Sequence, residues 1–168
     1  VEKDKSSNDF AGGDGLTLTL NGTQYQKGLG VHSNSAIVYA IGGNYSYFFG
    51  EVGVDDEVKE NGSVVFMVYA DSQKLFDSGV MTGSSATQVI YVNITGKQRL
   101  ELLVSNAGNG NDYDHADWAN ASFIGTGLVV VQPQQIKPQC SDGVDNDVDG
   151  FIDMIDVGCT DVNDNNET

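Results

Sequence analysis

The densest group of chemically versatile side chains lies just beyond residue 110. It combines three carboxylates, a histidine, a tyrosine and the only tryptophan of the chain: Asp112, Tyr113, Asp114, His115, Asp117 and Trp118. Glycine and asparagine precede this stretch and a β-prone run follows it, a pattern that is typical of a loop between strands. Because such loops carry function, these residues could bind a metal, bind a sugar or act in acid–base catalysis.

Sugar binding suits this stretch better than catalysis. Glycoside hydrolysis needs two carboxylates about 5 or 6.5–9.5 Å apart across a cleft, which neighbouring residues of one loop seldom provide. No serine or cysteine nucleophile motif occurs in the sequence. A sugar site needs a ring that stacks under C–H faces and polar groups that meet hydroxyls. Four residues qualify by type, namely Asn111, Tyr113, Asp114 and His115.

A second candidate site is the acidic loop near the C-terminus. Asp145, Asp147 and Asp149 alternate, and Gly150 follows at the sixth position, where a calcium loop of EF-hand type turns sharply. The later ligands of that pattern fall on Phe151 (through its carbonyl), Asp153 and Asp156. Hard oxygen ligands at this density select calcium. The loop resembles those of dockerins and thrombospondin type 3 repeats, since its last ligand is Asp and no helices flank it.

Features around this loop indicate an oxidising, extracellular environment. Cys140 and Cys159 are the only cysteines and bracket the loop, so we predict a disulfide that closes about twenty residues and contributes roughly 3 kcal/mol. Six Asn-x-Ser/Thr sequons suggest a glycosylated secreted protein. Their asparagines are Asn21, Asn44, Asn61, Asn93, Asn120 and Asn166.

The elements that must position these side chains are β-strands. Residues 16–20 alternate strictly between apolar and polar, residues 64–70 form the most apolar run, and turn signals recur at roughly ten-residue spacing. Without any helical periodicity, this pattern predicts an all-β, antiparallel sandwich over residues 1–131. Both prolines fall in a linker at 132–139, and residues 140–168 form the acidic calcium-binding segment.

The charge balance excludes two classes of partner. The formal net charge is −16, from 24 acidic and 8 basic residues, which argues against nucleic acid and against anionic membrane surfaces. No apolar run approaches 18 residues, so we expect no membrane insertion. The acids concentrate in the last thirty residues, which favours a local cation site there.

Five motifs carry a resemblance to a known family. They are KGLGVHS (27–33), VGVDDEV (52–58), GSVVF (62–66), DSGV (77–80) and DYDHADWA (112–119). In this order, the motifs make residues 1–124 resemble the NPCBM family of carbohydrate-binding modules. The resemblance implies a jelly-roll β-sandwich, usually attached to secreted glycoside hydrolases, that binds galactose-containing or other glycans and is not itself an enzyme.

The resemblance also implies a calcium ion where the N-terminal loop meets the last strand. The candidate ligands here are Asp4, Ser6, Asp9, Ala116 (through its carbonyl) and Asp117. Family members begin with a further strand that this sequence lacks before Val1. An open sheet edge invites pairing with another chain, so we expect a neighbouring molecule or a preceding repeat to supply the strand.

Two hypotheses follow. The first is a non-catalytic, secreted, calcium-stabilised carbohydrate-binding module whose partners are glycans. The alternative is a glycosylated structural subunit of an extracellular fibre or surface layer. In that alternative, copies of the chain would assemble head to tail through strand complementation and calcium. Both hypotheses place the protein outside the cell or at its surface.

Overall fold

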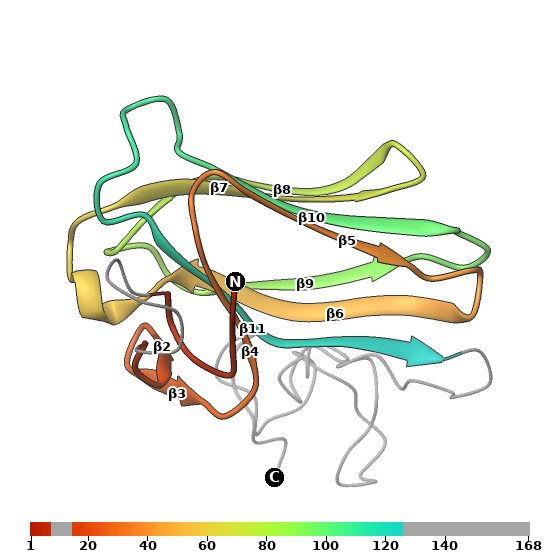
Figure 1. The fold of residues 1–168 in the computed structure, drawn as a ribbon, viewed down its shortest axis with the longest axis horizontal. Helices are drawn as coiled ribbons and strands as arrows, with labels where there is room; N and C mark the ends of the chain where they lie inside the picture. Colours follow the sequence, from red (N-terminus) through yellow and green to blue (C-terminus); the bar gives the residue numbers. More distant parts are fainter. Residues whose placement is uncertain (8–14, 126–168) are drawn as a thin grey trace, which may run out of the picture. The chain divides into compact units, whose positions relative to one another are not determined.

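The computed structural model describes residues 1–7 and 15–125, and within these ranges the fold is an antiparallel β-sandwich (Figure 1). Its five-stranded sheet has the order β1-β4-β11-β6-β9. These strands are β1 (Glu2–Lys3), β4 (Gly28–His32), β11 (His115–Gly125), β6 (Tyr45–Val54) and β9 (Gln88–Asn93). The predicted all-β antiparallel fold is therefore confirmed for the described residues.

The second sheet has four antiparallel strands in the order β5-β10-β7-β8. They are β5 (Ser35–Ala40), β10 (Arg99–Ser105), β7 (Ser63–Ala70) and β8 (Gln73–Thr82). A short 3-10 turn, η1 (Asp56–Val58), connects β6 to this sheet. No helix among the described residues is long and apolar enough to cross a membrane.

The core lies between the two sheets and is built from alternate residues of their strands. In β7 the side chains of Val64, Phe66 and Val68 are fully buried, as period-two alternation requires for a strand with one face inward. Trp118 of β11 is also fully buried, and its ring meets Phe66 edge-on at a centroid distance of 5.1 Å. Trp118 is thus a core residue and is not available to ligand.

A small hairpin covers part of the outer face of the five-stranded sheet. Its strands are β2 (Leu18–Leu20) and β3 (Thr23–Tyr25), joined by a turn at Asn21 and Gly22, which both have positive φ. Leu18, Leu20 and Tyr25 pack with Ala119 of β11 in a second apolar cluster. The outer face of β11 is therefore buried at this end of the sheet, and the polar residue Asp117 is buried with it.

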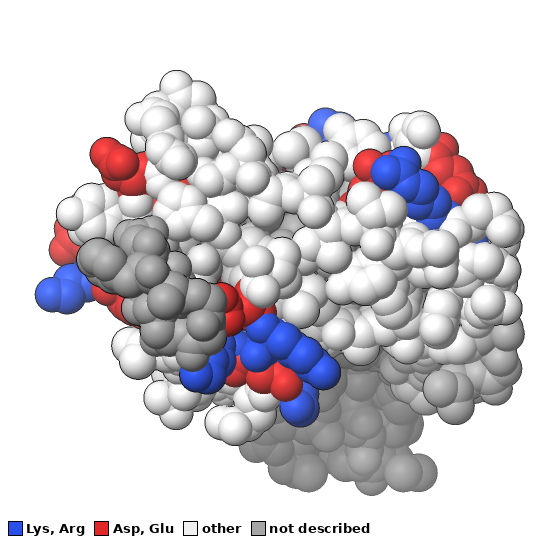
Figure 2. Space-filling view, viewed as in Figure 1, with Lys and Arg blue, Asp and Glu red and all other residues white. Residues whose placement is uncertain are grey.

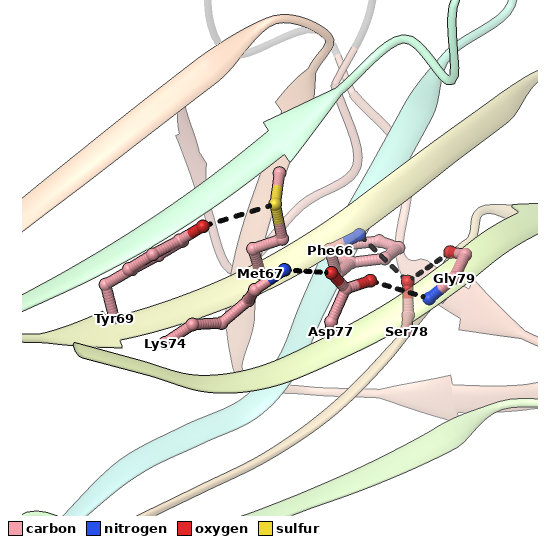
Figure 3. A network of polar contacts seen from close by, with 7 residues as sticks. All are labelled: Phe66, Met67, Tyr69, Lys74, Asp77, Ser78 and Gly79. Atoms are coloured by element: carbon pink, nitrogen blue, oxygen red, sulfur yellow. Dashed lines mark hydrogen bonds and ion pairs between the residues drawn. The ribbon is translucent and has the colours of Figure 1, made fainter. Parts of the chain in front are cut away.

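The DSGV motif is a β-bulge that shapes the edge strand β8. Phe66 of β7 lies opposite two residues, Ser78 and Gly79, because the register shifts there. Gly79 has a φ of +64°, which glycine adopts without steric cost. The Ser78 hydroxyl accepts the hydrogen bond that the Phe66 N–H would otherwise donate to the ladder, at 2.9 Å (Figure 3). Asp77 closes the turn by accepting from the Gly79 N–H.

Charged side chains on the face shown in Figure 2 gather in separate patches of mixed sign, with uncharged surface between them. The five sequon asparagines within the described ranges are all exposed: Asn21, Asn44, Asn61, Asn93 and Asn120. Asn166, the cysteines Cys140 and Cys159, the acidic calcium loop and the boundaries at 131, 132, 139 and 140 lie outside these ranges.

Candidate functional site

The turn between β10 and β11 forms one wall of a cavity of about 410 Å³ at one end of the sandwich. Its lining residues are His32, Asn111, Asp112 and Tyr113. Asn111 and Tyr113 are two of the predicted sugar contacts. His32 is the last residue of β4. It pairs with His115 of β11, which places it beside this turn. The polar groups and the ring that a sugar site needs thus converge on one hollow.

Tyr113 projects from this turn as an exposed aromatic side chain. It is 56% exposed and has a φ of +63°, a left-handed conformation that is uncommon for a bulky residue. Its carbonyl oxygen accepts a hydrogen bond from the His115 N–H at 2.8 Å and lies against Gly62. The backbone of Tyr113 is therefore held firmly while its ring remains accessible, and such local strain is often found at binding sites.

Asp114 fixes the turn from inside. It is only 1% exposed, and its carboxylate accepts hydrogen bonds from the Ser33 hydroxyl and from the Ser63 N–H, the latter at 2.8 Å. These donors come from the β4–β5 connection and from the start of β7, so Asp114 joins three segments that are distant in sequence. Both carboxylate oxygens have donors, so Asp114 acts as a structural clamp behind the cavity and is not placed to contact a ligand.

His115 is also largely enclosed. Its side chain is 9% exposed, and its Nδ1 lies 2.7 Å from Oε1 of Glu57 in η1. Its ring meets that of His32 edge-on, with centroids 5.4 Å apart. The structure therefore brings all four predicted sugar contacts to one end of the sandwich, with Asn111 and Tyr113 outside and Asp114 and His115 beneath them.

Asp117, the predicted calcium ligand of β11, is completely buried on the outer face of its sheet. No hydrogen-bond donor among the described residues reaches either carboxylate oxygen. Burial first, and then contact with Asp55 and the charges of Glu57 and Asp56, raise the pKa of Asp117 well above its ordinary value. A buried carboxylate without donors needs either a proton or a cation.

The N-terminal segment passes over this carboxylate. Gly30 and Gly53 flank Asp117 in register on β4 and β6 and so share its face of the sheet. A Cβ added to Gly30 would lie 2.3 Å from the Lys5 carbonyl oxygen, and a Cβ added to Gly53 would lie 3.1 Å from Leu20. The two glycines therefore admit the N-terminal backbone and the β2–β3 hairpin as a cover above Asp117.

The other predicted ligands of this calcium site differ in where their side chains lie. Ser6 is fully buried, and its hydroxyl accepts from the Leu16 N–H at 3.0 Å. Asp4 instead turns to Lys27, with which it forms an ion pair at 2.8 Å that keeps its pKa low. Ala116 precedes Asp117 and faces the core, while Asp9 lies outside the described residues.

Asp55 is the residue that sequence reasoning missed at this site. It is 1% exposed at the end of β6, where it accepts from the N–H groups of Thr19 and Glu57. The available signal was the acidic run at 55–57 directly after a strand. Within 1–7 and 15–125, no three His, Cys, Asp or Glu side chains are placed so that they could hold a metal ion together. A metal here would rely on two carboxylates and on backbone carbonyls.

A separate groove of about 200 Å³ lies where β11 extends beyond the end of its neighbour β4. β4 pairs with β11 only as far as Ala119. A bulge in β11 follows directly, and Asn120 there has a positive φ. The groove is lined by Lys3, Asp4, Lys27, Gly28, Leu29, Tyr39, Phe48, Ala121 and Phe123. One backbone edge of β11 therefore lacks a strand partner within the described part of the chain.

Comparison with known families and structures gives a consistent picture. A model of the NPCBM/NEW2 domain matches residues 1–124. The domain CBM51 from Clostridium perfringens GH95, solved with methyl-galactose, is 38% identical with a TM-score of 0.63, over 73% of this chain and 94% of that chain. CBM51-2 of Clostridium perfringens ZmpB, solved with GlcNAc, is 31% identical with a TM-score of 0.62, over 73% of this chain and 30% of that one.

Two curated relatives are much longer proteins. A "Putative endo-alpha-N-acetylgalactosaminidase" of Renibacterium salmoninarum is 40% identical over 141 residues, which are 84% of this chain and 9% of that protein. Alpha-1,3-galactosidase B of Akkermansia muciniphila is 33% identical over 114 residues, which are 66% of this chain and 14% of that protein. This chain thus spans only a small part of the curated relatives that it matches.

Proposed function

This chain belongs to the NPCBM/NEW2 domain family, and on that premise we propose that it is a non-catalytic module that binds glycans through the cavity beside Tyr113. The observation that carries the proposal is an exposed aromatic ring on an anchored backbone, next to a hollow lined by an amide, a carboxylate and an imidazole. A ring that stacks under a sugar face and polar groups that meet its hydroxyls are what such a site requires.

The assigned contacts are Tyr113 as the stacking platform and Asn111, Asp112 and His32 as hydrogen-bonding groups. Asp114 and His115 support them from beneath. Two related domains were solved with methyl-galactose and with GlcNAc. We take neutral hexoses and N-acetylhexosamines as the ligand class, and we place the module in a secreted glycoprotein.

Isothermal titration of the chain with methyl galactoside and with GlcNAc tests this proposal, after a glycan array has shown which sugars to use. Tyr113→Ala and Asn111→Ala should each weaken binding by about tenfold, since each removes one main contact. Asn44→Ala, an exposed asparagine in the β5–β6 turn, is the matched control and should bind normally. Absence of any glycan ligand for the folded protein would refute the proposal.

Calcium belongs to the same proposal. Asp117 and Asp55 supply two oxygen ligands, and the Lys5 carbonyl lies above the same face of the sheet. Calcium takes six to eight oxygens, many of them from backbone and water, so this donor set fits the ion. Bound there, calcium would neutralise the two buried carboxylates and tie the N-terminal segment to β11. A further calcium at Asp145–Asp156, with a Cys140–Cys159 disulfide, remains part of the proposal.

A structural subunit is the second candidate function. The groove beside the unpaired edge of β11 favours it, because an added strand from a second copy of this chain would find both backbone partners and apolar contacts there. Electron microscopy with calcium and with chelator tests the idea. Filaments that dissolve on chelation support assembly, whereas a monomer in both conditions contradicts it.

A further inference from the structure

A second cavity lies on the other side of Tyr113. Its volume is about 470 Å³, and it is lined by Leu16, Glu57, Val58, Lys59, Asn61, Tyr113 and His115. Both this cavity and the first one fall within the size range of small-molecule sites, about 300–1,000 Å³. Among the residues that the structure describes, Tyr113 is the one that lines both cavities. The exposed ring therefore stands as a ridge between two hollows.

The wall between the cavities is rigid. Gly62 has a φ of +74°, and a Cβ there would lie 2.2 Å from the Tyr113 carbonyl oxygen, so the 61–63 turn packs directly against the Tyr113 backbone. Asp114, the residue after Tyr113, accepts a hydrogen bond from the Ser63 N–H and so holds the same turn. The backbone of Tyr113 is therefore held in place, and its side chain remains 56% exposed.

The floor continues from one cavity to the other. His32 lines the first cavity and His115 lines the second, and their rings are in edge-to-face contact. Glu57, which also lines the second cavity, holds His115 through Nδ1. A ligand that crosses Tyr113 would thus meet polar groups on both sides.

The chemistry of the second cavity suits a neutral, acetylated sugar. Glu57 and Lys59 bring opposite charges, so neither an anionic nor a cationic ligand gains a clear advantage. The amide nitrogen of Asn61 donates to the Val58 carbonyl, which leaves the amide oxygen of Asn61 to accept from a ligand. Leu16, 63% exposed, supplies an apolar surface for an acetyl methyl group or a C–H face.

We propose that the second cavity is a subsite for an N-acetylhexosamine, so that the domain binds a neutral glycan of at least two sugars across Tyr113. This inference rests on the proposed function, because the first sugar occupies the cavity at Asn111. It assigns Leu16, Lys59 and Asn61 to ligand binding, which the family resemblance and the motifs did not suggest.

Calorimetry separates the inference from its premise. The probes are methyl β-galactoside, GlcNAc, Galβ1-3GalNAc and Galβ1-4GlcNAc, with protein made without N-glycans because Asn61 belongs to a sequon. At least one disaccharide should bind about tenfold more tightly than either monosaccharide. The double variant Leu16→Ala/Lys59→Ala should reduce disaccharide affinity to the monosaccharide level and leave methyl galactoside binding unchanged. Lys97→Ala, a partly exposed lysine in the turn between β9 and β10, is the control.

Each outcome has a distinct meaning. Equal affinities for monosaccharides and disaccharides, unaffected by the double variant, would overturn the second subsite while the proposed function stands. Binding of none of the four probes, together with a blank glycan array, would overturn both. A disaccharide advantage that persists in the double variant would also overturn the inference, because the second sugar would then lie elsewhere.

Discussion

Asp114 and Asp117 lie at the same end of β11 and are both buried, but they differ in their hydrogen-bond donors. Asp114 is 1% exposed and accepts from two donors, the Ser33 hydroxyl and the Ser63 N–H. Asp117 is fully buried and accepts from none within the described chain. Burying a charge is costly unless it is paired or hydrogen-bonded. The first group is therefore complete within the protein, and the second requires a proton or a cation.

The difference separates two tasks at neighbouring positions. Asp114 clamps the turn that presents Tyr113 to ligand, so its role is structural and does not require calcium. Asp117 has no donor within the described chain and has a raised pKa, so under the proposal its charge depends on pH and on calcium. We expect substitutions at these two positions to respond in different ways to calcium, to denaturant and to sugar.

The largest effect should come from breaking the clamp. Asp114→Ala leaves the Ser33 hydroxyl and the Ser63 N–H without their acceptor, and we expect a loss of about 3 kcal/mol or more in the free energy of unfolding. Urea denaturation measures it, with and without calcium, and the loss should be the same in both. Asp112→Ala changes an exposed neighbour and should shift stability by no more than about 0.5 kcal/mol. Equal effects of the two variants would contradict the clamp.

Calcium should reveal the opposite character of Asp117. At about 100 times its dissociation constant, calcium should stabilise the wild-type protein by about 2.7 kcal/mol. Asp117→Asn should lose this gain but should be at least as stable as the wild type in chelator at pH 7, because the raised pKa means that charging Asp117 opposes folding. Denaturation of both proteins in calcium and in chelator provides the measurement.

Asp147→Asn is the control for that experiment, because it alters the acidic loop outside the described residues and leaves the sandwich carboxylates intact. The gain in sandwich stability from calcium should survive in this variant. If Asp117→Asn responds to calcium as the wild type does, the proposed site at Asp117 is wrong.

Sequence reasoning predicted the β-sandwich fold and the stretch that forms the candidate site, but not the different roles of the residues in that stretch. The continuous apolar run at 64–70 predicts strand β7, and the structure buries alternate side chains of that strand in the core. The positive φ at Tyr113 reverses the direction of successive side chains, so residue types alone could not show that Tyr113 faces outward and Asp114 inward. Asp55 pairs with Asp117 only through the folded sheet, and no local spacing announces that contact.

Gly62 offers a test of how firmly Tyr113 is positioned. Gly62→Ala and Gly96→Ala both place alanine at a φ of +74°, at a cost of about 1–2 kcal/mol. Only at Gly62 would the new Cβ strike the Tyr113 carbonyl, since nothing lies within 4 Å of the Cβ position at Gly96. Gly62→Ala should therefore lose more stability and also weaken sugar binding, although it touches no sugar. Calorimetry and denaturation of the two variants measure both effects.

The smallest expected effect concerns a third carboxylate, Glu51, which resembles Asp114 in having donors. Tyr25 donates to Glu51 at 2.7 Å, and Asn120 donates to its other oxygen at 3.1 Å. Tyr25→Phe removes one of these bonds and should cost about 1 kcal/mol at pH 7. The variant should not alter the response to calcium, because Asp117 keeps its surroundings.

Alkaline pH sharpens this last prediction. Burial, together with the hydrogen bond to Glu51 and its charge, raises the pKa of Tyr25 from 10.0 to about 12. A group with a raised pKa in the folded state stabilises it fully below the unfolded pKa, and that contribution disappears as the pH rises through the folded pKa. The wild type should therefore lose stability between pH 10 and about 12, whereas Tyr25→Phe should lose less. Tyrosine absorbance titration with parallel denaturation follows both, and identical pH profiles would show that the Tyr25–Glu51 bond does not hold the hairpin against the sheet.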